Sequence, residues 1–286
     1  MDTQILYMGL LLFAGSGIFI GIMSLLKRKL FVDIWLIYVI TAFTTSSVIV
    51  PAYFQGVVLL LSLLFFTGRT TYEMATILKL GRQKFVCMLF MMVIITVLYF
   101  HMYQIAVAAF VLYVMYCLIH LLWDDTLQSI HCLIVAVYPG IFLSYFTLLV
   151  CGENGFYYIV FLYAIVEVND ATSYLCGKFF GRHKLWPAVS PNKTYEGIIC
   201  GGIAAFCVGL SIGFVVPEFA FWEQVILVFM IVLLSPCGDL VASKIKRICD
   251  VKDFSTLIPT QGGALDMIDS LIFTAPVFYY FLIFTS

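Results

Sequence analysis

The sequence predicts an all-α polytopic membrane protein, and three observations support that prediction. The 286 residues are 63% hydrophobic and 11% charged, whereas a soluble domain is about 25% charged. The apolar residues fall in long runs, and a soluble core of this size cannot bury so many of them. The charged residues gather in short stretches between the runs, and the formal net charge of −1 argues against a nucleic-acid partner.

Ten apolar runs are expected to span the membrane as one integral domain over residues 1–286, with N-terminal helices in 1–150 and a second half in 156–286. In order, the runs cover 5–26, 34–50, 52–67, 85–100, 105–122, 132–150, 156–168, 198–216, 222–235 and 268–284. The second and third form a hairpin broken at Pro51, and each is near the lower limit of about 17 residues for a span. If that hairpin is a single span, the count falls to nine. Residues 69–84 are mixed in polarity and predict a short interfacial helix.

The positions of the basic residues favour ten membrane spans over nine. With the N-terminus outside and ten crossings, both termini lie outside, and all fifteen Lys and Arg residues face the cytoplasm, in 27–29, 69–84, 178–193 and 244–252. The positive-inside rule predicts this asymmetry, and a merged hairpin would place the later basic segments outside. No cation precedes the first run, which predicts an uncleaved helix rather than a secretory signal. Together with the short loops, this favours a bacterial cytoplasmic membrane.

The cysteine and glycine residues are less informative about structure than the apolar runs. The nine cysteines include no Cys-x-x-C pair, and most lie in apolar runs, so we expect small buried hydrophobes rather than ligands or bridges. Gly197 with Gly201, and Gly209 with Gly213, have the GxxxG spacing of close helix packing.

The main polar segment is residues 238–270, GDLVASKIKRICDVKDFSTLIPTQGGALDMIDS, which lies between two apolar runs. On a helix, Asp239, Ser243 and Lys246 share one face, and Asp266 and Asp269 share another. Carboxylates on two elements can hold a hard cation such as Mg²⁺, and the cations can hold phosphates. A solvated, charged loop between two membrane helices is an equal alternative at this point.

A second charged segment, residues 167–196, is predicted on the same membrane face. Its Asp170 lies at the end of an apolar run, where a charge is costly unless it has a partner or faces water. A turn from Ser190 to Thr194 leads into the next helix, and Ser190 or Asn192 is expected to cap that helix. The turn, the helix N-terminus and Lys193 also predict an anion site, which can coexist with a cap.

These residues resemble the motifs of the CDP-diacylglycerol synthases (phosphatidate cytidylyltransferases). The signature of that family is matched by Ser243, Lys246-Arg247, Lys252-Asp253, Pro259, Gly262-Gly263, Asp266 and Asp269-Ser270. Residues 190–197, SPNKTYEG, resemble the family's Ser-Pro-Lys-Lys-Thr-Trp-Glu-Gly, and the run from Asp170 to Gly181 resembles a third motif. Spaced motifs in the right order are far more specific than any one of them.

The resemblance implies that CTP and phosphatidate, or another lipid phosphate, give CDP-diacylglycerol and pyrophosphate at a site in the half that covers residues 156–286. It implies Mg²⁺, alone or with a second, monovalent cation, contact with membrane lipids, and a homodimer. The predicted catalytic residues are Asp239, Asp266, Lys246, Arg247 and Lys252. The predicted substrate-binding residues are Ser190, Lys193, Thr194, Asp170, Ser243, Gln261, Gly262 and Gly263. The predicted metal ligands are Asp239, Asp266, Asp253 and Asp269.

The sequence departs from the family pattern at three positions. Gln261 replaces a histidine, Thr260 replaces a glycine, and Met267 replaces an arginine. Glutamine cannot titrate and methionine cannot hold a phosphate, so we interpret the chain as a divergent member and leave the identity of its lipid substrate open. The alternatives are an inactive paralogue, a CTP-dependent polyprenol or lipid kinase, and a transporter whose intramembrane carboxylates carry cations.

Overall fold

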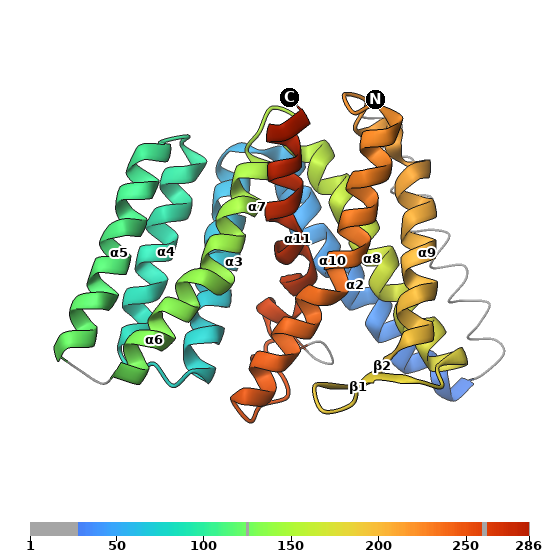
Figure 1. The fold of residues 1–286 in the computed structure, drawn as a ribbon, viewed down its shortest axis with the longest axis horizontal. Helices are drawn as coiled ribbons and strands as arrows, with labels where there is room; N and C mark the ends of the chain where they lie inside the picture. The colour runs from blue at the N-terminus through green and yellow to red at the C-terminus, as the bar shows by residue number, and fades with distance from the viewer. Residues whose placement is uncertain (1–27, 124–125, 259–261, 286) are drawn as a thin grey trace. The chain divides into compact units, whose positions relative to one another are not determined.

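The computed structural model describes residues 28–123, 126–258 and 262–285 (Figure 1). The chain forms two compact units, residues 1–51 and 52–286. The first predicted span, 5–26, lies outside the described residues. The division of the chain at residue 150 stays a prediction.

The first described helix, α2, runs from Arg28 to Phe54 and contains Pro51. The predicted break at Pro51 is therefore wrong by a few residues. The helix ends instead where Gln55 and Gly56 take φ angles of 53° and 54°, because left-handed residues cannot continue a right-handed helix. The Gln55 side chain donates a hydrogen bond of 2.8 Å to the Ala52 carbonyl, which satisfies an acceptor at the helix end.

The next three helices are α3 (Gly56–Ile77), α4 (Gln83–Tyr99) and α5 (Tyr103–Trp123). The interfacial helix predicted for 69–84 is wrong, because residues 69–77 continue α3 and are largely buried in the protein. Helix α3 ends at Ile77, and Lys79, with a φ of 59°, prevents its continuation. The Leu80 N–H returns to the Ala75 carbonyl at 2.9 Å, as in a Schellman-type C-terminus.

Helix α6 (Thr126–Val135), the π-helical turn η1 (Ala136–Ile141) and α7 (Phe142–Val150) form one interrupted span. The interruption is at Tyr138, whose φ of −128° and ψ of 112° are extended. Pro139 follows it, lacks an N–H and disfavours a helical conformation for the residue before it.

The remaining elements carry the polar segments. They are α8 (Gly155–Phe180), β1 (Lys184–Trp186), β2 (Ser190–Thr194), α9 (Tyr195–Ser211), η2 (Gly213–Val215), α10 (Phe221–Ile248) and α11 (Ala264–Thr285). The predicted turn at 190–194 is one strand of an antiparallel hairpin. Helices α8 and α10 extend well beyond their apolar runs, so the polar residues up to 180 and 248 are helical.

Close packing at glycines brings α8 and α9 together. A Cβ on Gly197 would lie 2.6 Å from the Ser173 carbonyl, and one on Gly201 would lie 2.0 Å from the Ser173 hydroxyl. The GxxxG prediction is confirmed for this pair, because only glycine leaves room for the neighbouring backbone. Helix α11 packs against α10, α7 and α3, and Figure 1 shows it between α7 and α10.

The structure confirms an all-α polytopic membrane protein. Six described helices are long and apolar enough to cross a membrane, namely 56–77, 103–122, 126–150, 155–180, 221–248 and 264–285. Three shorter apolar helices cover 42–54, 83–99 and 195–211. Each of the nine predicted spans within the described residues falls on one of these helices. The number of crossings and the outside location of both termini stay predictions.

Candidate active site

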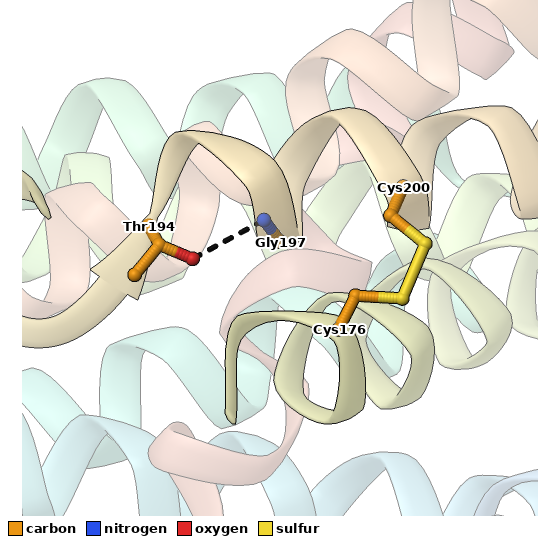
Figure 2. Close-up of a disulfide and its surroundings, with 4 residues drawn as sticks. All are labelled: Cys176, Thr194, Gly197 and Cys200. Carbon is orange, nitrogen blue, oxygen red and sulfur yellow. Dashed lines mark hydrogen bonds between the residues drawn. A yellow bond between two sulfur atoms is a disulfide. The ribbon is translucent and has the colours of Figure 1, made fainter. Parts of the chain in front are cut away.

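Thr194 begins α9 and positions the hairpin beside it. Its Oγ1 accepts a hydrogen bond of 3.2 Å from the Gly197 N–H (Figure 2). The cap predicted at Ser190 or Asn192 is therefore wrong, because both residues lie in β2 and the chain stays extended up to Thr194. A threonine N-cap satisfies one of the free N–H groups of the helix.

A disulfide joins α8 to α9 one turn further along. Cys176 and Cys200 are bonded, with their Cα atoms 6.4 Å apart (Figure 2). The prediction that the cysteines form no bridge is wrong for this pair. The two are 24 residues apart in sequence, and only the glycine-lined contact between the helices brings them within bonding distance.

Glu196 fixes the other end of the hairpin. Its carboxylate accepts hydrogen bonds from the Arg182 N–H at 3.1 Å and from the His183 ring at 2.6 Å. The hydrogen bond from the His183 ring, with those from the backbone, lowers the pKa of Glu196 to about 2. The hairpin is thus attached at both ends to the N-terminus of α9.

The two charged segments meet through Lys193 and Asp239. The Lys193 Nζ lies 2.6 Å from Asp239 Oδ2, with exposed side-chain fractions of 20% and 34%. On the other side, the Ser243 hydroxyl donates a 3.1 Å hydrogen bond to Asp239 Oδ1. The face predicted to contain Asp239 and Ser243 therefore exists on α10, and it faces the end of the hairpin.

Asp266 holds the loop before α11. The Lys246 Nζ lies 2.5 Å from Asp266 Oδ1, and both side chains are nearly buried. The Phe254 and Gly263 N–H groups donate to Asp266 Oδ2 at 2.9 and 2.8 Å. Gly262 has a φ of 92°, and a Cβ there would lie 2.7 Å from the same oxygen. Both carboxylate oxygens of Asp266 already accept hydrogen bonds, so these contacts favour a positioning role over metal binding.

Sequence reasoning missed Glu73, which lies on α3 and is 1% exposed. It forms an ion pair of 2.9 Å with Arg69 and accepts a 2.7 Å hydrogen bond from the Ser255 hydroxyl. It also accepts from the Ala264 and Leu265 N–H groups at 3.1 and 3.0 Å, so it caps the N-terminus of α11. The one signal in the sequence was the i,i+4 spacing from Arg69, which is common on exposed helices.

Three carboxylates from different helices lie near one another. Asp269 on α11 is 5% exposed and accepts a 2.6 Å hydrogen bond from the Ser270 N–H. Asp170 on α8 and Asp269 each interact electrostatically with Asp239 on α10 and with each other. Lys193 also acts on Asp170, while Lys246 acts on Asp239 and Asp269.

This arrangement fits a hard cation in chemistry and charge. Carboxylate oxygens are the ligands that Mg²⁺ prefers, and the repulsion among Asp170, Asp239 and Asp269 is relieved by a positive ion. In residues 28–123, 126–258 and 262–285, no three Asp, Glu, His or Cys side chains are arranged to hold a metal ion. The carboxylates would have to move closer together to bind one.

The other predicted residues lie at the margin of this cluster or apart from it. The exposed Arg247 donates to the carbonyls of Val189 and Val251 at 3.3 and 3.2 Å, and so attaches the hairpin loop to α10. Lys252 and Asp253 are exposed, Ser190 is half-buried in β2, and Gly263 lies beside Glu73. Gln261 lies outside the described residues.

Comparison with known proteins identifies relatives. Residues 6–285 match the model of a family described as "Cytidylyltransferase family". The uncharacterized protein YnbB of Escherichia coli (strain K12) is 45% identical over 130 residues, which are 46% of this chain and 44% of that protein. The phosphatidate cytidylyltransferases of Staphylococcus saprophyticus and Staphylococcus aureus (strain COL) are 37% and 36% identical over 158 residues, 55% of this chain and 60% of each relative. The chain thus spans about half the length of the curated relatives it matches.

Proposed function

The chain belongs to the cytidylyltransferase family, and on that premise we propose that it transfers the cytidylyl group of CTP to phosphatidate or a related lipid phosphate. The products are a CDP-lipid and pyrophosphate. The observation that carries the proposal is the convergence of Asp170, Asp239 and Asp269 with Lys193 and Lys246 at the ends of apolar helices. Relatives named phosphatidate cytidylyltransferase support the choice of lipid.

The reaction needs positioning and charge neutralisation more than a strong base. A phosphate oxygen of the lipid attacks the α-phosphorus of CTP, the bond from that phosphorus to the bridging oxygen breaks, and pyrophosphate leaves. The lipid phosphate is already an anion near neutral pH, and stabilisation of the charge on the transferring group supplies most of the catalysis. Lys193 and Lys246 are the cations placed for that task. Lys193 pairs with Asp239, and Lys246 pairs with Asp266 and acts electrostatically on Asp239 and Asp269.

A bound Mg²⁺ would neutralise the phosphates that approach the carboxylates. We assign Asp239 and Asp269 to its binding, as predicted, and add Asp170, because these three carboxylates repel one another in the structure. Asp266 would hold Lys246 and the loop before α11 in place. Asp253 is exposed and has a smaller role in this scheme.

The site is proposed to face the cytoplasm of a bacterial cell. CTP is a water-soluble cytoplasmic metabolite, and the basic segments that surround the site are the ones the positive-inside rule places there. The charged ends of α8, α10 and the hairpin share this side of the molecule with the start of α11 (Figure 1).

The test uses the purified full chain with CTP, Mg²⁺ and a panel of lipid phosphates and polyprenols. Mass spectrometry should find a CDP-lipid, with pyrophosphate released in equal amount. A phosphorylated lipid with release of CDP would instead identify a kinase, and no nucleotide-dependent product from any lipid would refute the proposal.

Two neighbouring lysines supply a matched pair of variants. Lys246→Met should reduce turnover by about 100-fold or more, because it removes a nearly buried cation from the cluster. Lys244→Met alters an exposed lysine on the same helix and should keep at least about half of the activity. Equal losses in the two variants would remove the support for Lys246.

A further inference from the structure

Tyr138 is buried, with 5% of its surface exposed, yet its hydroxyl has no hydrogen-bond partner within the described part of the chain. Buried hydroxyl groups in proteins are almost always hydrogen-bonded, and an exception calls for an explanation. The need is greater here, because Tyr138 lies in a segment, 126–150, that is apolar enough to span a membrane.

The backbone at Tyr138 is irregular, which is unusual inside such a segment. Helix α6 ends before it, α7 begins after it, and Tyr138 itself is extended. Non-helical backbone at membrane depth is tolerated where it is buried in protein or lines a cavity. This interruption is buried, so the feature that indicates a binding role is the unpaired hydroxyl of Tyr138.

The ring of Tyr138 is held firmly while its hydroxyl is left free. It packs edge-on against Phe142, with ring centroids 5.5 Å apart, and Phe142 stacks on Phe273 of α11 at 5.2 Å. Phe273 lies against Gly238, the residue before Asp239, since a Cβ on Gly238 would lie 2.7 Å from the Phe273 Cβ and 2.8 Å from the Asp269 carbonyl oxygen. These contacts place Tyr138 beside the candidate active site, and its phenol interacts electrostatically with the carboxylates of Asp269, Asp239 and Asp266. It makes no hydrogen bond to any of these three carboxylates.

We propose that Tyr138 is a substrate-binding residue whose hydroxyl donates a hydrogen bond to a phosphate oxygen held at the carboxylate cluster. The inference rests on the proposed function and extends it to a residue outside the family motifs. A phenol suits this position because it donates a hydrogen bond without adding charge, and Lys193 and Lys246 in the candidate active site already have carboxylate partners. The phosphate belongs either to CTP or to the lipid.

The test compares Tyr138→Phe with Tyr113→Phe in the full chain in detergent or nanodiscs. Tyr113 is equally buried, but its hydroxyl donates to the Cys132 carbonyl at 2.9 Å and contacts the Cys87 sulfur at 3.1 Å. Tyr138→Phe should leave the Tm of the ligand-free protein within about 1 °C of wild type, because no hydrogen bond is lost. Tyr113→Phe should lower that Tm and leave substrate binding unchanged.

Kinetics then identify the ligand. Tyr138→Phe should lower kcat/KM by about 10-fold to 100-fold. A rise in KM for CTP alone would assign the hydrogen bond to the nucleotide, and a rise for phosphatidate alone would assign it to the lipid. If Tyr138→Phe lowers the Tm as Tyr113→Phe does, or leaves kcat/KM unchanged, Tyr138 is structural and the inference is overturned.

A binding measurement separates this inference from the proposed function. If wild-type protein forms no CDP-lipid, the proposed function fails, and the increase in Tm caused by CTP or by phosphatidate still tests Tyr138. Loss of that increase in Tyr138→Phe supports the inference. An equal increase in both proteins, or none in wild type, overturns it.

Discussion

Replacing Glu73 with glutamine should loosen the start of α11 and thereby the candidate active site. The carboxylate is 1% exposed and accepts hydrogen bonds from Ser255, Ala264 and Leu265. Glutamine keeps one acceptor oxygen but turns an NH₂ group toward these donors, so at least one buried N–H loses its partner. Hydrogen bonds to a charged group contribute about 1.5–3 kcal/mol each, and Arg69 is left without its anion. We expect a loss of about 2–4 kcal/mol in the free energy of unfolding, or about 5–10 °C in Tm.

Thermal unfolding in detergent and lipid turnover should be measured on the same samples. Glu223→Gln is the matched control, because Glu223 accepts a 2.8 Å hydrogen bond from the Ala220 N–H at the start of α10 but is only half-buried. Its loss should cost about 0.5–1 kcal/mol. Glu73→Asp keeps the charge with a shorter side chain and should fall between wild type and Glu73→Gln. A Tm for Glu73→Gln no lower than that of the control, with normal turnover, would refute the view that Glu73 positions α11.

Other contacts give further expected outcomes. Asp266→Asn leaves a nearly buried lysine unpaired and should lower CTP-dependent product formation at least about 100-fold, whereas near-normal turnover would contradict its role. Mass spectrometry should find Cys176 linked to Cys200 and labelled by maleimide only after reduction; free thiols before reduction would contradict the bridge. Glu196 has a pKa lowered to about 2 by His183, from an ordinary value of 4.5. Its stabilising contribution is complete above pH 4.5 and lost as the pH falls toward 2, so its carboxyl ¹³C signal should titrate near 2, and nearer 4.5 in His183→Ala.

The sequence was sufficient to predict the helices, because apolar runs of this length have few alternatives in a membrane. It also predicted that residues 167–196 and 238–270 would meet, since the positive-inside rule places both on one membrane face. The contact between Lys193 and Asp239 agrees with that prediction. The ends of the helices were less predictable. Polar residues in α8 and α10 remain helical because other helices and the hairpin supply their partners, and hydropathy contains no information about those partners.

The contributions of α3 and η1 were missed for a different reason. Glu73 lies in a mixed segment, where its spacing from Arg69 is common on exposed helices, and Tyr138 lies in an apolar run, so neither residue belongs to a motif that indicates a site. Their importance arises from tertiary contact, because Glu73 caps α11 and the Tyr138 phenol lies beside the carboxylate cluster. The family motifs lie only in residues 156–286. They therefore predicted the charged residues of the site but not Glu73 or Tyr138, which lie earlier in the chain.

These two residues bear on whether the half that covers residues 156–286 is a catalytic unit. Helix α11 has its N-terminal N–H groups capped from α3, and its aromatic face packs on Phe142 of α7. A fragment without residues 1–150 would leave the N-terminus of α11 uncapped and expose the Phe273 ring. It would keep every residue of the family motifs and still lack the contacts of Glu73 with Ser255, Ala264 and Leu265. Helices α3 and α7 therefore support the site, because they hold a motif-bearing helix in one position.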